Sequence, residues 1–114
     1  MNSQDVSRLQ GSFYVISALW PLIHMRSFEA VSGPKKDKWL VRTVSGLLVT
    51  IGMEQLRSPG NAAGMAVARR LGIGTAATLA AIDLVYAGKG RISKIYLLDA
   101  AVELSLIRSW LKKR

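Results

Sequence analysis

The stretch LGIGTAATLAAIDLVYAG, residues 71–88, decides how the rest of the chain is interpreted. A helix on the surface of a water-soluble bundle carries polar and charged residues along one face. In this stretch Asp83 is the only charged residue, and no side of the predicted helix is polar. The pattern therefore favours a helix without a water-exposed face, and it predicts a span of a lipid bilayer.

The composition supports the same interpretation. Half of the 114 residues are hydrophobic, yet 16 Lys and Arg stand against 7 Asp and Glu, which gives a net charge of +9. The basic residues form short groups at the ends of apolar segments, without the aromatic interleaving of single-strand nucleic-acid binders. We therefore expect anionic lipid headgroups and no nucleic acid as partners. The absence of cysteine excludes disulfides, thiolate catalysis and cysteine-ligated metals.

Four apolar segments predict helices at about residues 12–28, 39–56, 65–88 and 92–111. The connectors between them contain helix-breaking residues: SGPKKDK (32–38), RSPGNAAG (57–64) and AGKGR (87–91). The predicted fold class is all-α, a single domain of residues 1–114 that forms a four-transmembrane-helix bundle. A soluble, oligomeric bundle is the alternative, because the second and third segments reach the roughly 20 residues of a full span only with one or two charges inside. The polar start, residues 1–13, lacks the pattern of a signal peptide, so we expect it to be retained.

Four spans would place the N-terminus, the second connector and the C-terminus on one side of the membrane. Of the 16 Lys and Arg, eight fall on that side and eight on the other. The positive-inside rule therefore gives no orientation. Either the chain inserts both ways round, as the antiparallel dimers of small exporters do, or the helix ends differ from those expected, for example because Arg69 and Arg70 lie within a span.

Each segment, placed on a helix of 3.6 residues per turn, has one polar or small-residue face, and we expect the four faces to meet at the bundle centre. The faces are Ser17, Trp20, Pro21 and His24; Thr43, Gly46, Thr50 and Glu54; Gly72, Ala76, Ala80 and Asp83; and Tyr96, Asp99, Glu103 and Trp110. The small residues of the third face predict close helix packing. Pro21 predicts a kink in the first helix.

The acidic residues on these faces carry the functional hypotheses. A charge at mid-bilayer costs about 2.5 to 3.5 kcal/mol, so Glu54, Asp83, Asp99 and Glu103 need either partners or a purpose. Long arginines near the segment ends can reach inward and pair with them, namely Arg42, Arg57, Arg91 and Arg108. Alternatively, Asp83 and Glu54 lie close enough to an interface to stay solvated. Asp99 and Glu103 are the best candidates for a function, because two carboxylates one turn apart repel each other and can retain a proton for exchange, cation binding or acid catalysis.

His24 is the only histidine in the chain. We expect it to cap a helix or to lie at an interface, unless a carboxylate from another segment makes it a proton carrier or base. One histidine with scattered acids lacks the spacing of a metal site, and neither a phosphate-binding loop nor a nucleophile elbow is present. We therefore expect no metal and no cofactor.

The charged stretch RSFEAVSGPKKDKWLVRTVSG, residues 26–46, is expected to be a loop at the membrane surface. Gly33 and Pro34 predict a turn, and Trp39 is placed to anchor the second helix at the headgroups. Glu29 and Asp37 are expected to pair locally with the lysines. The alternative is a polar mouth of a cavity, formed by Arg26, Glu29, Lys35 and Asp37.

Two stretches, WPLIHMRSFEAVSGPKKDKWLVRTV (20–44) and GRISKIYLLDAAVEL (90–104), resemble a group of small bacterial multi-pass membrane proteins of unknown function. The resemblance implies a four-helix integral protein of the bacterial inner membrane and no particular activity. The size and the four-span layout are also similar to those of the small multidrug resistance exporters and the fluoride channels. The exporters, however, place an essential glutamate in the first span, where this chain has none before Glu29.

The leading hypothesis is a small oligomeric transporter or channel in which buried carboxylates exchange protons or bind a cation. Its ligand-binding or proton-binding residues are Trp20, Glu54, Asp83, Tyr96, Asp99 and Glu103. The alternative is a membrane-embedded isomerase, cyclase or hydrolase acting on a lipid or isoprenoid. Its acid and base would be His24, Asp99 and Glu103, and its apolar pocket would be lined by Trp20, Tyr96 and Trp110. An accessory subunit of a membrane complex is the third hypothesis. The expected partners are the bilayer, further copies of the chain and a small apolar or cationic ligand.

Overall fold

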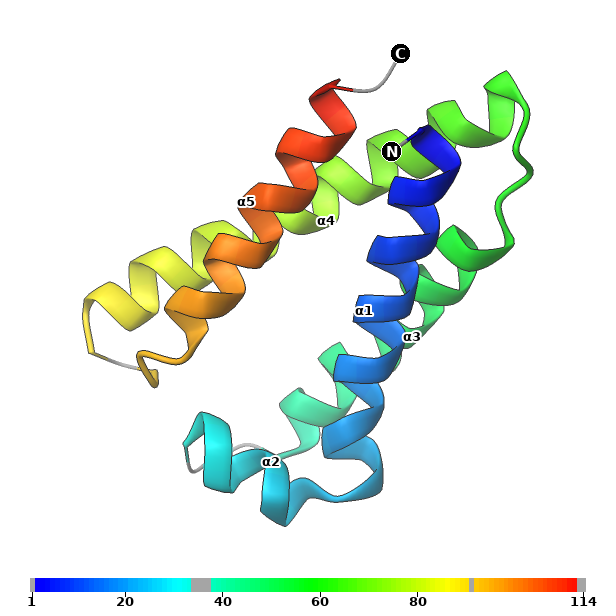
Figure 1. Cartoon of the computed structure of the whole chain (residues 1–114). Helices are drawn as coiled ribbons and strands as arrows, with labels where there is room; N and C mark the ends of the chain where they lie inside the picture. Colours follow the sequence, from blue (N-terminus) through cyan, green and yellow to red (C-terminus); the bar gives the residue numbers. More distant parts are fainter. Residues whose placement is uncertain (1, 34–37, 91, 113–114) are drawn as a thin grey trace.

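The computed structural model describes residues 2–33, 38–90 and 92–112, and within these ranges the chain forms five α-helices and no strand (Figure 1). The helices are α1 (Ser3–Ile23), α2 (Met25–Ser32), α3 (Lys38–Arg57), α4 (Ala62–Gly88) and α5 (Tyr96–Lys112). The all-α prediction is confirmed. Among the described helices α4 alone is long and apolar enough to cross a membrane, so length and composition support one of the four expected spans.

The first helix begins at Ser3, well before the expected residue 12. Asn2 caps it: the Asn2 side chain accepts the Asp5 N–H at 2.9 Å, and the Asp5 carboxylate accepts the Asn2 N–H at 3.3 Å. This reciprocal pair satisfies two of the backbone groups that a helix start leaves open. A start that looks like a polar tail in the sequence is therefore part of the helix.

The segment expected to be one helix over residues 12–28 is broken at His24, where the backbone leaves helical geometry with φ −145° and ψ 82°. The break comes three residues after Pro21, which lies in the last turn of α1 and has no N–H to donate to the carbonyl of residue 17. The short helix α2 begins directly after the break and ends at Gly33, whose φ of 96° favours glycine. Part of the expected surface loop is therefore helical.

Glu29 in α2 lies near the start of α3, where Lys38 Nζ is 3.6 Å from its Oε1 atom. The expected local pairing of Glu29 with a lysine is thus present. Its expected counterpart Asp37, like the turn residue Pro34, lies outside the described residues. Trp39 is 65% exposed in the first turn of α3.

The four long helices form two antiparallel pairs, α1 with α3 and α4 with α5 (Figure 1). The pairs cross near the end of the molecule that holds the N-terminus and diverge away from it. The short connection 58–61 joins α3 to α4 and so links the two pairs. We call the pairs the first hairpin (α1 and α3) and the second hairpin (α4 and α5).

Two glycines hold the first hairpin together by direct backbone contact. A Cβ atom on Gly11 would lie 2.7 Å from the Gly52 carbonyl oxygen, and a Cβ on Gly52 would lie 2.8 Å from the Gly11 carbonyl oxygen. No larger residue fits at either position without moving the helices apart. Arg8 adds a second tie, because its guanidinium donates to the carbonyls of Gln55 at 2.7 Å and Ser58 at 2.9 Å, at the end of α3.

Burial in this molecule is the reverse of the usual pattern. The buried apolar residues are mostly alanines, and the side chains of Gln10, Gln55 and Glu103 are at most 1% exposed. Large apolar side chains lie outside on all four long helices; Ile16 is 71% exposed and Leu98 63%. In a water-soluble monomer, large apolar side chains fill the core, and extended apolar surfaces mark contact with protein or lipid.

Candidate functional site

The small-residue ridge of α4 is buried, as the sequence predicts. Gly72, Ala76, Ala80 and Asp83 all face the interior. Gly72 leaves room for side chains of three other helices, because a Cβ there would lie 2.6 Å from Trp110 Nε1 and 2.7 Å from Gln55 Nε2, and would collide with Gln10 Oε1. The ridge therefore makes space for polar groups at the centre of the bundle.

These polar groups form what we call the amide cluster: Gln10 of α1, Gln55 of α3 and Trp110 of α5, packed over Gly72 of α4. Gln10 Oε1 accepts one hydrogen bond from Gln55 Nε2 and one from Trp110 Nε1, each at 2.7 Å. Gln10 Nε2 donates to the Gly72 carbonyl and to the Tyr14 hydroxyl, both at 3.0 Å. A single glutamine side chain thus links all four long helices.

Tyr14 connects the amide cluster to a group of acids. Its hydroxyl accepts from Gln10 and donates to Glu103 Oε1 at 2.7 Å, and both Tyr14 and Glu103 are buried. A hydroxyl that accepts a hydrogen bond from an amide N–H is free to donate its own O–H to the carboxylate. Tyr14 therefore fixes the Glu103 side chain.

Three acids form what we call the carboxylate cluster: Asp83 of α4, and Asp99 and Glu103 of α5. The Asp99 carboxylate interacts with those of both Asp83 and Glu103. Asp83 and Glu103 are buried and Asp99 is half-buried. Side-by-side carboxylates repel one another when all are ionised, and a shared proton or a bound cation relieves the repulsion.

The carboxylate cluster lacks the basic partners considered in the sequence. Within residues 2–33, 38–90 and 92–112 the ion pair found is that of Lys38 with Glu29, which lies outside the cluster. Arg91 lies outside the described residues. Asp83 Oδ2 is buried and has no hydrogen-bond partner in the described part of the chain. In the same part, no three His, Cys, Asp or Glu side chains are arranged to hold a metal ion.

A groove of about 490 Å³ runs between α1 and α2 on one side and α5 on the other, and it reaches Asp99. Its lining residues are Phe13, Ile16, Ser17, Trp20, Phe28, Val31, Ser32, Ile95, Tyr96, Leu98, Asp99 and Val102. The groove thus brings together three of the predicted ligand-binding residues, Trp20, Tyr96 and Asp99. We call it the aromatic groove.

The helix α2 forms one wall of this groove, and its position is set by Trp20. The Trp20 indole N–H donates to Ser27 Oγ at 2.8 Å, and the Trp20 ring meets Phe28 edge to face with centroids 5.6 Å apart. A Cβ on Gly33, at the far end of α2, would lie 3.6 Å from Ser93 Cβ in the connection before α5. The end of α2 therefore reaches across to the second hairpin.

Glu54 does not join this site. The predicted inward face of Thr43, Thr50 and Glu54 is wrong, because these three side chains are exposed. The α3 helix instead turns Gly52 and Gln55 inward. The glycine contact with α1 requires that rotation, which carries the neighbouring Glu54 outward.

His24 also lies outside the carboxylate cluster and outside the groove lining. Its side chain is exposed and caps α2 by accepting the Ser27 N–H at 3.2 Å. This is the structural role considered for His24, and the acid and base set of His24, Asp99 and Glu103 is not assembled. Trp110 does not line the groove either: its indole is buried, donates to Gln10 and packs in an apolar cluster with Val6 and Ala68.

The sequence did not identify Gln10, Tyr14 and Gln55. Gln10 precedes residue 12, where the first helix was expected to begin. Ser7, Gln10 and Tyr14 are spaced three and four residues apart, so extending the helix to Ser3 would have shown one polar stripe.

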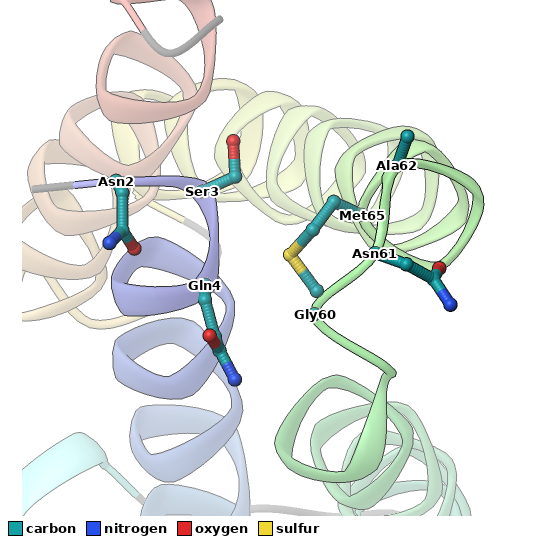
Figure 2. Close-up of a pocket in the computed structure, with 7 residues that line it drawn as sticks. All are labelled: Asn2, Ser3, Gln4, Gly60, Asn61, Ala62 and Met65. Carbon is teal, nitrogen blue, oxygen red and sulfur yellow. The ribbon is translucent and has the colours of Figure 1, made fainter.

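A second pocket, of about 320 Å³, lies at the opposite end of the molecule between the start of α1 and the turn into α4 (Figure 2). Its residues include Asn2 and Asn61, the N-caps of α1 and α4. Their side chains already accept backbone N–H groups, Asn2 from Asp5 at 2.9 Å and Asn61 from Gly64 at 2.7 Å. The side-chain oxygens of these two residues are therefore already engaged in capping.

Comparison with protein-family models, with curated proteins and with solved structures finds no match to this chain. The function is therefore inferred from the site geometry.

Proposed function

We propose that this chain is a small membrane-embedded transporter whose carboxylate cluster exchanges protons with a cation. The observation that carries the proposal is the position of Asp99. It interacts with two buried acids on one side and lines the aromatic groove on the other. A ligand in the groove can therefore reach a negatively charged centre that is otherwise closed off.

The reversed burial supports a bilayer as the surroundings. Lipid tails solvate Leu, Ile and Val side chains, so helices in a membrane pack through small and polar residues instead. At about 1.5 Å per residue the four long helices are about 26 to 40 Å long, and the hydrocarbon core is about 30 Å thick. The apolar surface also offers area for a second copy of the chain, which keeps the predicted oligomer part of the proposal.

The arrangement suggests how protons and a cation exchange. A cation arriving in the groove is attracted to Asp99, and its charge replaces that of a proton retained in the carboxylate cluster. Asp83 and Glu103 add negative charge behind Asp99, and the Tyr14 hydroxyl keeps Glu103 oriented toward it. The amide cluster closes the other end of the hairpin interface, so a transport cycle requires the hairpins to move apart there.

Proton flux in liposomes tests this proposal. The purified protein is reconstituted with a pH-sensitive dye inside, and a gradient of the cation is applied. We expect Asp99→Asn and Glu103→Gln to reduce the flux at least about tenfold, because each removes a carboxylate from the site. Glu54→Gln is the matched control, since it removes an exposed acid of α3.

Flux through both cluster variants equal to that of the wild-type protein would refute the transporter. Recovery of a folded, monodisperse protein from the aqueous fraction of lysed cells without detergent would refute the membrane setting.

A further inference from the structure

We infer that the aromatic groove binds a lipophilic organic cation, with Asp99 as its counter-ion and the ring of Trp20 against its apolar groups. The inference rests on the proposed function, because it names the ligand class of the same site.

The charge of the groove selects a cation. Among the described residues that line it, Asp99 is the one with a charged side chain. Asp83 of α4 and Glu103, one turn farther along α5, interact electrostatically with Asp99 and add acidic groups to this site. An anion would meet repulsion here, and a neutral ligand would leave the Asp99 carboxylate uncompensated in apolar surroundings.

The walls of the groove select an apolar cation. They consist largely of hydrocarbon and aromatic side chains. Two polar groups nearby are already engaged: the Ser32 hydroxyl donates to the Phe28 carbonyl at 2.8 Å, and the Trp20 N–H donates to Ser27. A ligand with many N–H or O–H donors would lose hydration and find few acceptors beyond Asp99 and the hydroxyls of Ser17, Ser32 and Tyr96. A quaternary ammonium or phosphonium ion with apolar substituents meets no such cost.

Trp20 is held in place to receive such a ligand. Its hydrogen bond to Ser27 and its edge-to-face contact with Phe28 fix the ring before any ligand binds. Aromatic faces attract cations, and tryptophan does so most strongly. A volume of about 490 Å³ suits a small organic molecule.

The rim of the groove indicates how the ligand arrives. Ile16 and Leu98 line it and are 71% and 63% exposed. An apolar rim favours lateral access from hydrocarbon, which is where a lipophilic cation accumulates.

The test is calorimetric titration of the detergent-purified protein with tetraphenylphosphonium and with tetraphenylborate, two ions of similar shape and opposite charge. Protein-free micelles give the background. We expect saturable binding of the phosphonium at one site per chain and no binding of the borate.

Two variants locate the site. Asp99→Asn should weaken phosphonium binding about tenfold or more, because it removes the counter-ion. Trp20→Leu should weaken it about fivefold, whereas Trp39→Leu, a change at an exposed tryptophan outside the groove, should leave it unchanged. If Asp99→Asn does not fold, the two tryptophan variants decide.

Equal affinity for the two ions would overturn the inference and would indicate a site for neutral, lipid-like ligands. Phosphonium binding that is insensitive to Asp99→Asn and to Trp20→Leu would overturn it as well. The titration uses no gradient, so phosphonium binding without flux would refute transport alone. Proton exchange with inorganic cations in the absence of phosphonium binding would refute the ligand class alone.

Discussion

The amide cluster and the carboxylate cluster lie along the same hairpin interface, joined by Tyr14, but they differ in how their polar groups are satisfied. In the amide cluster, Gln10 uses both ends of its side chain and contacts three other helices. In the carboxylate cluster, acids face acids. One buried oxygen in each cluster, Gln55 Oε1 and Asp83 Oδ2, is without a hydrogen-bond partner in the described ranges. The amides hold the helices together through hydrogen bonds, whereas the acids lie against other acids.

We therefore expect the amide cluster to contribute to stability and the carboxylate cluster to the proposed function. Hydrogen-bonded buried amides stabilise a specific packing, and their loss leaves several partners without hydrogen bonds. Unpaired buried acids are costly, which makes them poor structural elements and good binding groups. Substitutions in the two clusters should therefore have opposite effects on stability.

The largest effect is expected from Gln10→Leu. The change leaves Trp110 Nε1 without its acceptor, Gln55 Nε2 with the Ala68 carbonyl at 3.5 Å as its remaining acceptor, and the Gly72 carbonyl without its side-chain donor. We expect it to reduce stability by about 3 kcal/mol or more. Thermal unfolding in detergent measures the loss. Gln4→Leu is the control, because Gln4 is an exposed glutamine of the same helix. Equal loss in both variants would contradict the role assigned to the amide cluster.

Gly52→Ala should have the next largest effect, a loss of about 1 to 3 kcal/mol, because the new methyl group meets the Gly11 backbone. Gly46→Ala in the same helix is the control, since a Cβ at Gly46 has nothing within 4 Å. Both variants are compared by unfolding midpoint. A Gly52→Ala protein as stable as the control would mean that α1 and α3 are farther apart than described.

Asp83→Asn should stabilise the protein by about 1 kcal/mol, because an amide can donate a hydrogen bond where a carboxylate only repels Asp99. The same unfolding measurement detects the gain, and the liposome assay should show slower proton exchange. A destabilised Asp83→Asn protein would indicate that the Asp83 carboxylate has a structural partner, and would remove the contrast between the two clusters.

The smallest effect is expected from Glu54→Gln, within about 0.5 kcal/mol of the wild-type protein, because Glu54 is exposed on α3. Proton exchange should also be unchanged. A clear loss of flux would restore Glu54 to the site and show that α3 is rotated from the position described.

The elements that the sequence predicted well depend on single segments. The ridge of Gly72, Ala76 and Ala80 is buried, the breaker-rich connectors follow the ends of α2, α3 and α4, and Asp99 and Glu103 lie together one turn apart. Each of these follows from spacing within one helix.

The elements that the sequence did not predict depend on pairs of segments. Two faces of α3 carry polar residues, and the glycine contact between Gly11 and Gly52 decides which one turns inward. Such a contact belongs to two helices at once, so neither segment reveals it alone. The start of α1 was missed for a related reason, because Ser7 and Gln10 look like tail residues until their partner Gln55 is known.

The connection 58–61 between the hairpins gives the chain a modular character. Each hairpin has its own extensive internal packing, and few residues tie it covalently to the other. In the proposed membrane setting, the two halves, coexpressed as separate polypeptides cut within this connection, should insert independently and reassemble. Their affinity would then measure, free of the linker, how strongly one buried glutamine holds four helices together.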